Sequence, residues 1–446
     1  MYYTIEQFKN FTPDRPTYAV FGDPIAHSVS PAFQRFLLGG YTDADYIAVH
    51  VPKEQLPQAL ELARQKLFGF NCTIPLKQVV MEHLDYIDPR AQSVNAVNTV
   101  TVDRGELRGF NTDIDGFFMT LERQNIALEG KRVLLLGSGG VSAVFAHCVL
   151  QSGGLLTVAS RNLQTAKQLA DGRAGHFLLE QVCGEFDIIL NGTPVGMHPN
   201  LEQCPMDFCR VTPAEFVFDS IYNPFKTRLL AQAERLGVKT ENGLFMLAAQ
   251  GAASHLYWTD RRFDPETLNN AATVCKAELV ARTGENIILT GFMGSGKTTA
   301  GTQLARILGY EFFDVDRHIE QAHGSITQIF NQHGEAHFRQ IEQDMLKTAM
   351  QSTRRVISTG GGIVTVLENR QALAGARNVV FLNIDLPAAR TRLEGCTTRP
   401  KMAENMQELF TRRLPLYRQC CGFEIDATAT VFECVDNILA QILERG

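Results

Sequence analysis

One short segment of the chain has the residue types and the spacing needed to hold a triphosphate. The run GFMGSGKT, residues 291–298, fits the pattern G-x-x-x-x-G-K-[ST]. Glycines in such a loop let backbone N–H groups face the phosphates, Lys297 adds a positive charge, and Thr298 offers a hydroxyl to Mg²⁺. A strand-like apolar run precedes the loop and a helix-like run follows it. This context argues against a chance glycine turn and predicts a nucleoside triphosphate site.

Downstream of this loop, charged residues and glycines are spaced in a way that suits a small acceptor molecule. The run FFDVD is expected to end a second strand, so that Asp314 and Asp316 face the same side and serve magnesium and an acceptor hydroxyl; a solvated loop is the alternative. Arg339 and Glu342 are three residues apart, so they would be neighbours on a helix; a simple surface ion pair is the alternative explanation of this spacing. Three consecutive glycines, 360–362, follow another strand and let a ligand approach the backbone closely.

An earlier glycine-rich turn has the features of a dinucleotide site. The strand-like run VLLL precedes the run GSGGVS, residues 137–142, which approximates G-x-G-x-x-G with a serine at the third glycine position. The next strand is expected to end at Ser160-Arg161, where a site that prefers NAD usually carries an acidic residue for the ribose. Arg161 can accept a 2′-phosphate instead, so NADP is favoured; a solvated arginine at a strand end is the alternative.

The N-terminal part of the chain is dense in short polar groups. Ser28 and Ser30 precede a proline and an expected helix, and Thr73 and Lys77 share one tight segment. The runs NAVNT and FNTD follow, the second ending at Asp113. Each of these groups alone suits a turn or a helix cap. Together, the hydroxyl, amide and charged groups predict a site for a polyhydroxylated acid.

Short apolar runs that alternate with helix-like stretches must position these residues, and they predict α/β folds with parallel sheets. Besides the strands before the two glycine-rich turns, the expected strands are YAVFG from Tyr18, DIILNG from Asp187, FVFDS from Phe216, RVIST from Arg355 and NVVFLNI from Asn378. A polar turn around Gly284 marks the main domain boundary. We expect an α/β substrate domain in residues 1–115, completed by about 240–280, a Rossmann domain in 116–239, and a P-loop parallel-sheet domain in 285–446.

Residues 285–446 resemble shikimate kinase. The resemblance rests on GFMGSGKT, FFDVD, GEAHFRQIE, STGGG, the pair Arg399-Pro400 and the run RLPLY from Arg413. It departs from the usual family pattern at Lys401-Met402, where two leucines are common, and in the short stretch between Arg399 and Arg413. The resemblance implies an ATP-dependent kinase in this part of the chain.

The kinase resemblance assigns roles to particular residues. Asp316 would hold the acceptor hydroxyls and help to deprotonate one of them, and Asp314 would assist Mg²⁺ together with Thr298. Arg339 and Arg413 would bind a substrate carboxylate, for which a planar bidentate donor is suited. The remaining substrate contacts would come from Gly360, Gly361 and Gly362, and the ATP contacts from Gly294, Ser295, Gly296, Lys297, Thr298, Thr299, Arg392 and Arg399, the last on a closing lid.

Residues of about 16–280 resemble shikimate dehydrogenase. Beyond the polar segments above, the matches are NGTPVGM from Asn191, DSIYNP from Asp219 and NGLFMLAAQGAASHLYW from Asn242. A second basic residue that often follows the arginine of the dinucleotide site is Thr165 here, and Lys167 is a possible substitute. The implied substrate ligands are Ser28, Ser30, Thr73, Asn98, Tyr222 and Gln250, and the implied NADP(H) ligands are Gly137, Ser138, Gly139, Gly140, Val141, Ser160, Arg161 and Gly243.

Lys77 and Asp113 would form the catalytic pair of this half. Reduction of a carbonyl delivers hydride to carbon and leaves negative charge on oxygen, which needs a proton or a cation within hydrogen-bond reach. Lys77 would act as the acid in reduction and as the base in oxidation, while Asp113 would hydrogen-bond the neighbouring hydroxyl and hold Lys77 in place. A salt-bridged surface lysine is the alternative.

The bulk composition sets limits on partners and location. The 446 residues are 45% hydrophobic and 20% charged, with a net charge of −6, so neither nucleic acid nor an anionic membrane is expected as a partner. The 10 cysteines are scattered without a CxxC pair, which favours reduced thiols in the cytoplasm over a zinc site. The N-terminus lacks the pattern of a signal peptide, and no apolar run is long enough to span a membrane. Oligomeric state does not follow from these features.

The two resemblances together imply a bifunctional enzyme that uses NADP(H), ATP and Mg²⁺. The first half would reduce 3-dehydroshikimate to shikimate, and the second would phosphorylate shikimate at its 3-hydroxyl. Two alternatives stay open. The first half could oxidise quinate with NAD, or one half could be a non-catalytic regulatory module.

Overall fold

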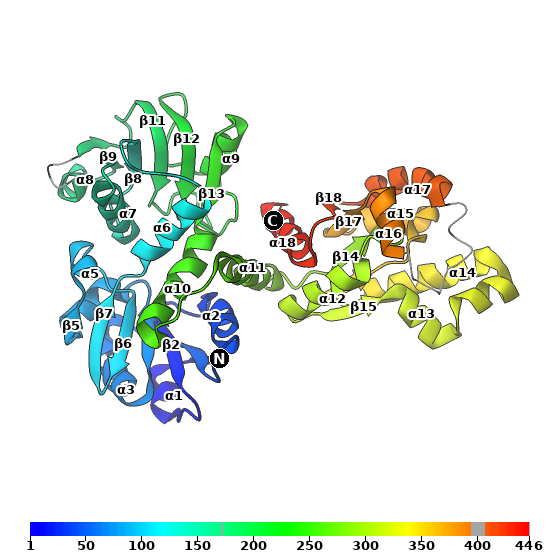
Figure 1. The fold of residues 1–446 in the computed structure, drawn as a ribbon, viewed down its shortest axis with the longest axis horizontal. Helices are drawn as coiled ribbons and strands as arrows, with labels where there is room; N and C mark the ends of the chain where they lie inside the picture. The colour runs from blue at the N-terminus through cyan, green and yellow to red at the C-terminus, as the bar shows by residue number, and fades with distance from the viewer. Residues whose placement is uncertain (171, 173, 394–405, 446) are drawn as a thin grey trace. The chain divides into compact units, whose positions relative to one another are not determined.

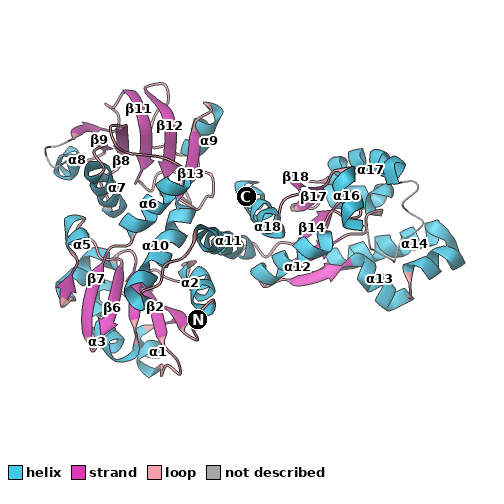
Figure 2. Ribbon diagram, in the orientation of Figure 1, coloured by secondary structure: helices cyan, strands magenta, loops and turns pink. Residues whose placement is uncertain are grey.

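The computed structural model describes all residues except 171, 173, 394–405 and 446. The chain forms two compact units, Met1–Cys275 and Lys276–Gly446 (Figure 1). Strands and helices alternate along most of both units, as Figure 2 shows. Within the described residues, no helix combines the length and the apolar character that crossing a bilayer requires. The α/β fold class predicted from the sequence is confirmed.

The first sheet has seven strands in the order β1-β3-β2-β4-β6-β7-β5. Its strands are β1 (Tyr2–Tyr3), β2 (Thr17–Gly22), β3 (Asp45–His50), β4 (Gly69–Cys72), β5 (Tyr86–Ile87), β6 (Thr99–Asp103) and β7 (Glu106–Phe110). The accompanying helices are α1 (Ile5–Asn10), α2 (Ser30–Gly39), η1 (Lys53–Gln55), α3 (Leu56–Lys66), α4 (Leu76–Val79), η2 (Val80–His83) and α5 (Pro89–Ser93).

This sheet is not purely parallel, which the alternation of strands and helices does not anticipate. Strand β6 runs antiparallel to both β4 and β7. The turn between β6 and β7 consists of Arg104 and Gly105, with φ of 48° and 84°. Two consecutive residues with positive φ give a turn whose twist matches that of a hairpin. Arginine is an uncommon residue at such a position, so the hairpin carries a weak sequence signal.

The second sheet is parallel throughout and has the strand order β10-β9-β8-β11-β12-β13. Its strands are β8 (Arg132–Leu136), β9 (Leu155–Ser160), β10 (Gly175–Leu178), β11 (Gly184–Asn191), β12 (Val211–Asp219) and β13 (Lys239–Asn242), with helices α7 (Gly140–Gln151), α8 (Leu163–Ala170) and α9 (Arg228–Arg235). The chain moves to one side of β8 and then returns to the other. In such sheets the crevice beyond the carboxyl ends of the strands at this reversal is the usual nucleotide site.

Two helices lie between the first two sheets (Figure 1): α6 (Asp113–Arg123) and α10 (Gly243–Thr259). They approach so closely that a Cβ on Gly116 of α6 would lie 2.8 Å from the Cβ of Gln250 on α10. Helix α10 is apolar on most of its surface because it is buried on most sides. The pair therefore links the polar end of the first sheet to the dinucleotide-type sheet.

The second unit is built on a parallel sheet with the order β15-β16-β14-β17-β18. The strands are β14 (Ile287–Thr290), β15 (Glu311–Asp314), β16 (Arg355–Ser358), β17 (Val379–Asn383) and β18 (Phe423–Asp426). The helices are α12 (Lys297–Leu308), α13 (Val315–His323), α14 (Ile326–Met350), η3 (Ile363–Thr365), α15 (Leu367–Ala374), α16 (Leu386–Leu393), α17 (Met406–Cys420) and α18 (Val431–Arg445).

The helix that precedes this sheet contributes to its core. Helix α11 (Pro265–Ala281) contains the division between the two units. In the second unit, Ala277 and Val280 are each 1% exposed and belong to the apolar core around β14 and β17. The Nζ of Lys276 lies 2.8 Å from a carboxylate oxygen of Asp436 on α18. The packed second unit thus starts before residue 285, at the last turns of α11.

Candidate active sites

The topology of the first sheet brings the predicted polar residues of the dehydrogenase half to one edge. Strands β2 and β4 are parallel, so the segments that follow them, with Ser28 and Thr73, lie at the same edge. Strand β6 is antiparallel to β4, so Asn98 precedes its start at this edge, and β7 ends there before Asp113. A Cβ on Gly22 at the end of β2 would lie 2.4 Å from the Cγ2 of Thr73. The loops are therefore in close contact.

Lys77 and Asp113 form an ion pair at this edge. The Nζ of Lys77 lies 2.6 Å from the Oδ2 of Asp113, and the two side chains are 30% and 10% exposed. Asp113 is the first residue of α6, where the partial positive charge of a helix N-terminus favours a carboxylate. The side chain of Asn111 fixes this start, since its Oδ1 accepts a hydrogen bond from the backbone N–H of Asp113 at 3.1 Å. This pair is half-buried, not a solvated surface salt bridge.

Asn98 and Gln250 face each other beside this pair. The Nδ2 of Asn98 donates to the Oε1 of Gln250 at 3.1 Å, and the side chains are 2% and 9% exposed. The Oδ1 of Asn98 accepts from the backbone N–H of Thr112 at 2.8 Å, which fixes the orientation of the amide. Among the contacts of the described residues, each amide nitrogen makes one hydrogen bond and keeps a second N–H for a ligand.

A buried network of three hydroxyls and the Asn71 amide surrounds Asn98. The sequence interpretation did not predict this network. Thr99 Oγ1, Thr112 Oγ1 and Ser254 Oγ lie within hydrogen-bond distance of one another, at 2.9–3.4 Å. The Nδ2 of Asn71 donates to Thr99 and Ser254 at 3.1 and 2.9 Å. Such a network holds the binding amide rigidly because each member is satisfied only in one arrangement. Ser254 lies on an apolar helix, and no local pattern connects it to the other three.

The dinucleotide-type turn adopts the geometry that its glycines predict. Gly137 has φ of 99°, and a Cβ there would lie 2.8 Å from the Cγ2 of Thr193. Gly139 and Gly140 are exposed at the start of α7, so backbone N–H groups are available to phosphate. Ser142 stands at the position of the third glycine. It is fully buried against Gly192, and its Oγ lies 3.5 Å from the Gly192 carbonyl oxygen.

Hydroxyl groups join the turns that follow β8 and β9. The Oγ of Ser138 lies 3.0 Å from the Oγ of Ser160 and 2.7 Å from the Oγ1 of Thr165. Thr165, which stands where a second basic residue is common, therefore braces the turn. Arg161 is exposed and makes no ion pair among the described residues. An exposed guanidinium at this corner fits a 2′-phosphate.

Tyr222 follows strand β12 of the second sheet, and Gly243 follows strand β13 as the first residue of α10. The backbone N–H of Gly243 donates to the carbonyl of Ile221 at 3.1 Å, and a Cβ on Gly243 would clash with the Ser220 carbonyl at 2.1 Å. Only glycine therefore fits this position. Asp219 anchors the same loop: it is fully buried, accepts from Asn191 at 2.9 Å and Thr227 at 2.6 Å, and burial raises its pKa to about 6.

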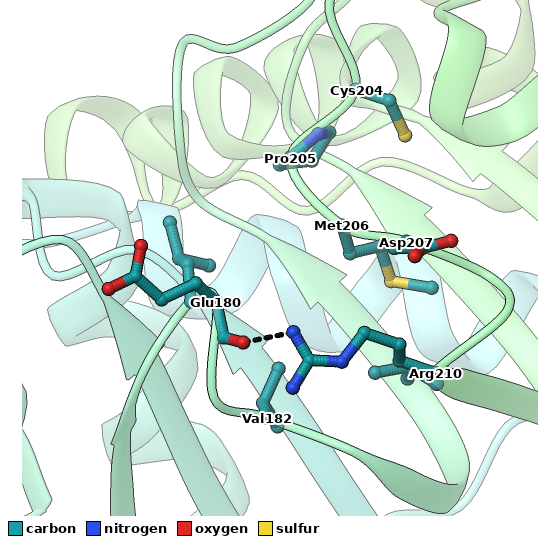
Figure 3. A pocket seen from close by; sticks show the side chains of 9 residues that line it. Glu180, Val182, Cys204, Pro205, Met206, Asp207 and Arg210 are labelled. Atoms are coloured by element: carbon teal, nitrogen blue, oxygen red, sulfur yellow. Dashed lines mark hydrogen bonds between the residues drawn. The ribbon is translucent and has the colours of Figure 1, made fainter.

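A cavity of about 300 Å³ opens on this sheet, but it does not contain the predicted site (Figure 3). Its walls come from residues 179–182 before β11 and residues 204–211 before and at the start of β12. None of these residues belongs to the glycine turn after β8 or to the predicted ligand set. Arg210 donates to the backbone carbonyl of Glu180 across it.

In the second unit, the P-loop has the conformation that phosphate binding requires. Gly291, Gly294 and Gly296 have positive φ of 152°, 79° and 83°. The Nζ of Lys297 donates to the carbonyls of Gly291 and Phe292 at 2.8 and 3.0 Å, so the lysine folds over the loop. Ser295 is 2% exposed and Thr299 is exposed at the start of α12. Arg392 lies over this loop, with Nη1 3.5 Å from the Gly294 carbonyl.

Asp314 and Asp316 do not share a strand face, which corrects the sequence prediction. Strand β15 ends at Asp314, and Val315 begins α13, so Asp316 lies in the first helical turn. Asp314 is the N-cap, and its other oxygen accepts from Thr298 Oγ1 at 3.0 Å. This arrangement of hydroxyl and carboxylate fits a hydrated Mg²⁺ beside the P-loop. Asp316 instead approaches Gly360, where a Cβ would lie 2.6 Å from its Oδ1.

The triple glycine is surrounded by charged side chains. A Cβ on Gly360 would also lie 2.6 Å from the Oε1 of Glu342, and one on Gly362 would lie 2.4 Å from two nitrogens of Arg339. The Gly361 carbonyl accepts from Arg413 Nη1 at 3.2 Å and from the Tyr417 hydroxyl at 2.5 Å. A side chain at Gly360 or Gly362 would therefore displace these charged groups, whereas a Cβ at Gly361 would make only ordinary contacts at 3.5 Å or more.

Arg339 and Glu342 are adjacent, as helical spacing predicts, but the pair is not on the surface. The Nη1 of Arg339 lies 2.6 Å from Glu342 Oε2, and the Glu342 side chain is 1% exposed. Burial raises the pKa of Glu342, with the Arg339 charge opposing. Arg413 is 6% exposed, and its buried Nε has no hydrogen-bond partner among the described residues. The sequence anticipated Glu342 as a neighbour of Arg339 but assigned it no role, and it did not anticipate Tyr417. Arg399 and the predicted lid lie outside the described residues.

The folds and sites define a dinucleotide-dependent oxidoreductase joined to a P-loop kinase. Residues 20–100 match the family model of the shikimate dehydrogenase substrate binding domain, and residues 293–443 match that of shikimate kinase. The shikimate dehydrogenase (NADP(+)) of Bacillus cereus (strain B4264) is 40% identical over 260 residues, which cover 55% of this chain and 92% of that protein. The chain belongs to the shikimate dehydrogenase family and carries a shikimate kinase domain after it.

Solved structures agree with this family. Shikimate 5-dehydrogenase from Thermus thermophilus, in complex with NADP(H) and shikimate, has a TM-score of 0.55 and 35% identity, covering 58% of this chain and 99% of that one. A chorismate mutase/shikimate 5-dehydrogenase fusion protein from Clostridium acetobutylicum has a TM-score of 0.56 and 28% identity, covering 60% of this chain and 100% of that one. Fusion of this dehydrogenase to another enzyme thus has a structural precedent.

Proposed function

We propose that the first unit reduces 3-dehydroshikimate to shikimate with NADPH, and that the second phosphorylates the 3-hydroxyl of shikimate with ATP and Mg²⁺. The observation that carries the proposal is the pairing of a half-buried Lys77–Asp113 ion pair in one unit with a P-loop and two arginines in the other, of which Arg413 is buried and Arg339 is half-buried. The 3-hydroxyl that the first reaction would form is the group that the second reaction would phosphorylate.

In the dehydrogenase unit, bound NADPH supplies the hydride. The Nζ of Lys77 donates a hydrogen bond to the substrate carbonyl and transfers its proton to the oxygen as negative charge develops there. Asp113, 2.6 Å from this amine, holds it in place and accepts a hydrogen bond from the neighbouring hydroxyl. Asn98 and Gln250 offer their second N–H groups to further oxygens, and Ser28, Ser30 and Thr73 would bind the carboxylate side.

In the kinase unit, the chain's own residues position the acceptor and neutralise charge, as phosphoryl transfer requires. Asp316 orients the acceptor hydroxyl and accepts its proton. Arg339 and Arg413 bind the carboxylate, and Lys297, Arg392 and Arg399 balance the charge of the triphosphate. Thr298 and Asp314 would hold Mg²⁺, which would supply positive charge to neutralise the triphosphate.

A coupled assay tests both activities in one sample. Full-length protein receives 3-dehydroshikimate and NADPH, and oxidation of NADPH is followed by absorbance before ATP and Mg²⁺ are added. We expect shikimate first and shikimate 3-phosphate only after ATP, with NADPH preferred over NADH. Activity on quinate with NAD⁺ that exceeds activity on shikimate would favour the alternative substrate. Loss of either turnover, with ligand binding retained, would identify that unit as a regulatory module.

The chemistry of the cysteines supports a cytoplasmic enzyme. All nine cysteines within the described residues are free thiols. An enzyme that consumes NADPH and ATP also needs a compartment that supplies both. We therefore retain the cytoplasm as the proposed location.

A further inference from the structure

The guanidinium of Arg339 donates hydrogen bonds to two glutamates of the same helix, α14. Nη1 donates to Glu342 at 2.6 Å, while Nε and Nη2 donate to one oxygen of Glu335 at 3.3 and 3.1 Å. The two acidic partners differ sharply in burial: the side chain of Glu342 is 1% exposed and that of Glu335 is 66% exposed. Glu342 is therefore the buried partner of Arg339, and Glu335 is the partner that lies open to solvent.

The surroundings of Arg339 leave one edge of its guanidinium for an anion. Gly362 packs against Nη1 and Nη2 on one side, since a Cβ there would lie 2.4 Å from both. The Nε–Nη2 edge is one of the edges at which arginine binds a carboxylate with two parallel hydrogen bonds. Glu335 holds this edge. The group that the proposed substrate needs is thus already in contact with a carboxylate of the chain.

Arg413, the other proposed carboxylate ligand, also responds to Glu335. Burial lowers the pKa of the Arg413 guanidinium and the nearby Arg339 charge lowers it further, while Tyr417 and, to a smaller extent, Glu335 act in the opposite direction. Glu335 therefore lies within electrostatic reach of both arginines. Glu335 supplies a negative charge near the two arginines, as the carboxylate of a bound acid would.

We propose that Glu335 is an internal substitute for the substrate carboxylate, which the incoming acid displaces from Arg339. Glu342 is the fixed anchor that keeps the guanidinium in place during the exchange. The proposal rests on the proposed kinase function, because it takes the acceptor to be a carboxylic acid. It deepens that function by assigning Glu335 a role in specificity: any anion must compete with a tethered carboxylate at high effective concentration.

The competing explanation makes Glu335 a positioning residue that only orients Arg339. The two explanations predict opposite signs. If Glu335 competes with the substrate, its neutralisation strengthens shikimate binding. If Glu335 only positions Arg339, its neutralisation weakens binding, because the guanidinium loses one of two supports.

The test uses Glu335→Gln in the full-length chain, with shikimate varied at saturating MgATP. We expect the KM for shikimate to fall about 3- to 10-fold, with kcat and the KM for ATP within about 2-fold of wild type. Sulfate, as a probe anion, should inhibit the variant at lower concentration than the wild type. Glu278→Gln is the matched control, because Glu278 pairs with Arg282 at the same i,i+4 spacing, 3.5 Å apart, outside the site. It should leave all these values unchanged.

Each outcome separates the displacement from the function on which it rests. A KM for shikimate that is raised or unchanged in Glu335→Gln, in an active enzyme, would overturn the displacement alone. Wild-type protein that phosphorylates no shikimate would overturn the proposed function. Glu335→Ala, which removes hydrogen bonding as well as charge, should also lower the KM, and melting curves of both variants should match the wild type because the side chain is mainly exposed.

Discussion

The Nζ of Lys77 lies 2.6 Å from the Oδ2 of Asp113. The proposed role of Lys77 as the proton donor in reduction can be tested with one substitution. Lys77→Met removes the ammonium and keeps most of the apolar stem. We expect the rate of 3-dehydroshikimate reduction to fall about 10²- to 10⁴-fold, the usual contribution of a general acid. The kinase rate of the same protein serves as the control and should stay unchanged. Dehydrogenase turnover near the wild-type rate would contradict the catalytic role.

Asp219 allows a second residue-scale prediction, about pH and stability. Burial raises its pKa to about 6 in the folded state, above the ordinary 3.8. The native state therefore keeps this proton while the unfolded chain releases it, so its contribution to stability is present below about pH 4 and is lost as pH rises through about 6. The loss is on the order of 3 kcal/mol at most.

Asp219→Asn removes this titration. An asparagine can still accept from Asn191 and can donate to Thr227, as a protonated carboxyl would. We expect the stability of the variant relative to wild type to increase between pH 4 and pH 7. Urea melts of the dehydrogenase unit at several pH values measure this difference. A difference that is independent of pH would contradict the assignment of this proton to Asp219.

At the scale of elements, the break in helix α14 shapes the kinase site. Gly334 has φ of 80° and ψ of 173° between two helical stretches, a conformation that only glycine adopts without strain. The second stretch starts at Glu335 and carries Arg339 and Glu342. Gly334→Ala should therefore cost about 1–3 kcal/mol of stability or reorient this stretch.

The expected result of Gly334→Ala is a several-fold rise in the KM for shikimate in the kinase assay, because Arg339 is displaced. Gly324→Ala is a suitable comparison, since Gly324 also has positive φ, 86°, and ends α13 before the same helix. It should lower stability with a smaller effect on the KM for shikimate. A Gly334→Ala variant with wild-type KM and stability would show that the break is not needed.

The sequence predicted features that local chemistry determines. The strands before both glycine turns and the P-loop conformation follow from apolar runs and from glycines that need positive φ. Asp316 was placed on the wrong element because the end of β15 depends on Asp314 capping α13, which a two-residue alternation does not reveal. The support of Asn98 by Ser254 could not be predicted, since it depends on how α10 crosses the first sheet.

At the scale of the whole molecule, the two activities are joined in one chain at a fixed ratio of one to one. Enzymes of this kind turn over at roughly 1–10³ s⁻¹, so each catalytic cycle takes a millisecond or more. A released small molecule diffuses away from its site far faster than that. In dilute solution, shikimate should therefore leave the protein before the kinase unit of the same chain captures it.

A mixing experiment measures whether the link between the units has a kinetic effect. Lys297→Ala is expected to abolish phosphoryl transfer and leave reduction intact, while Lys77→Met is expected to do the reverse. An equal mixture of the two variants, at twice the wild-type protein concentration, contains the same number of working sites of each kind as wild type. If shikimate equilibrates with solvent, the mixture and the wild type show the same lag before shikimate 3-phosphate forms, and added unlabelled shikimate dilutes a labelled intermediate fully in both. A shorter lag for the wild type, with incomplete dilution, would instead demonstrate transfer within one chain. The fixed ratio of sites would then be accompanied by a kinetic advantage of having both sites on one chain.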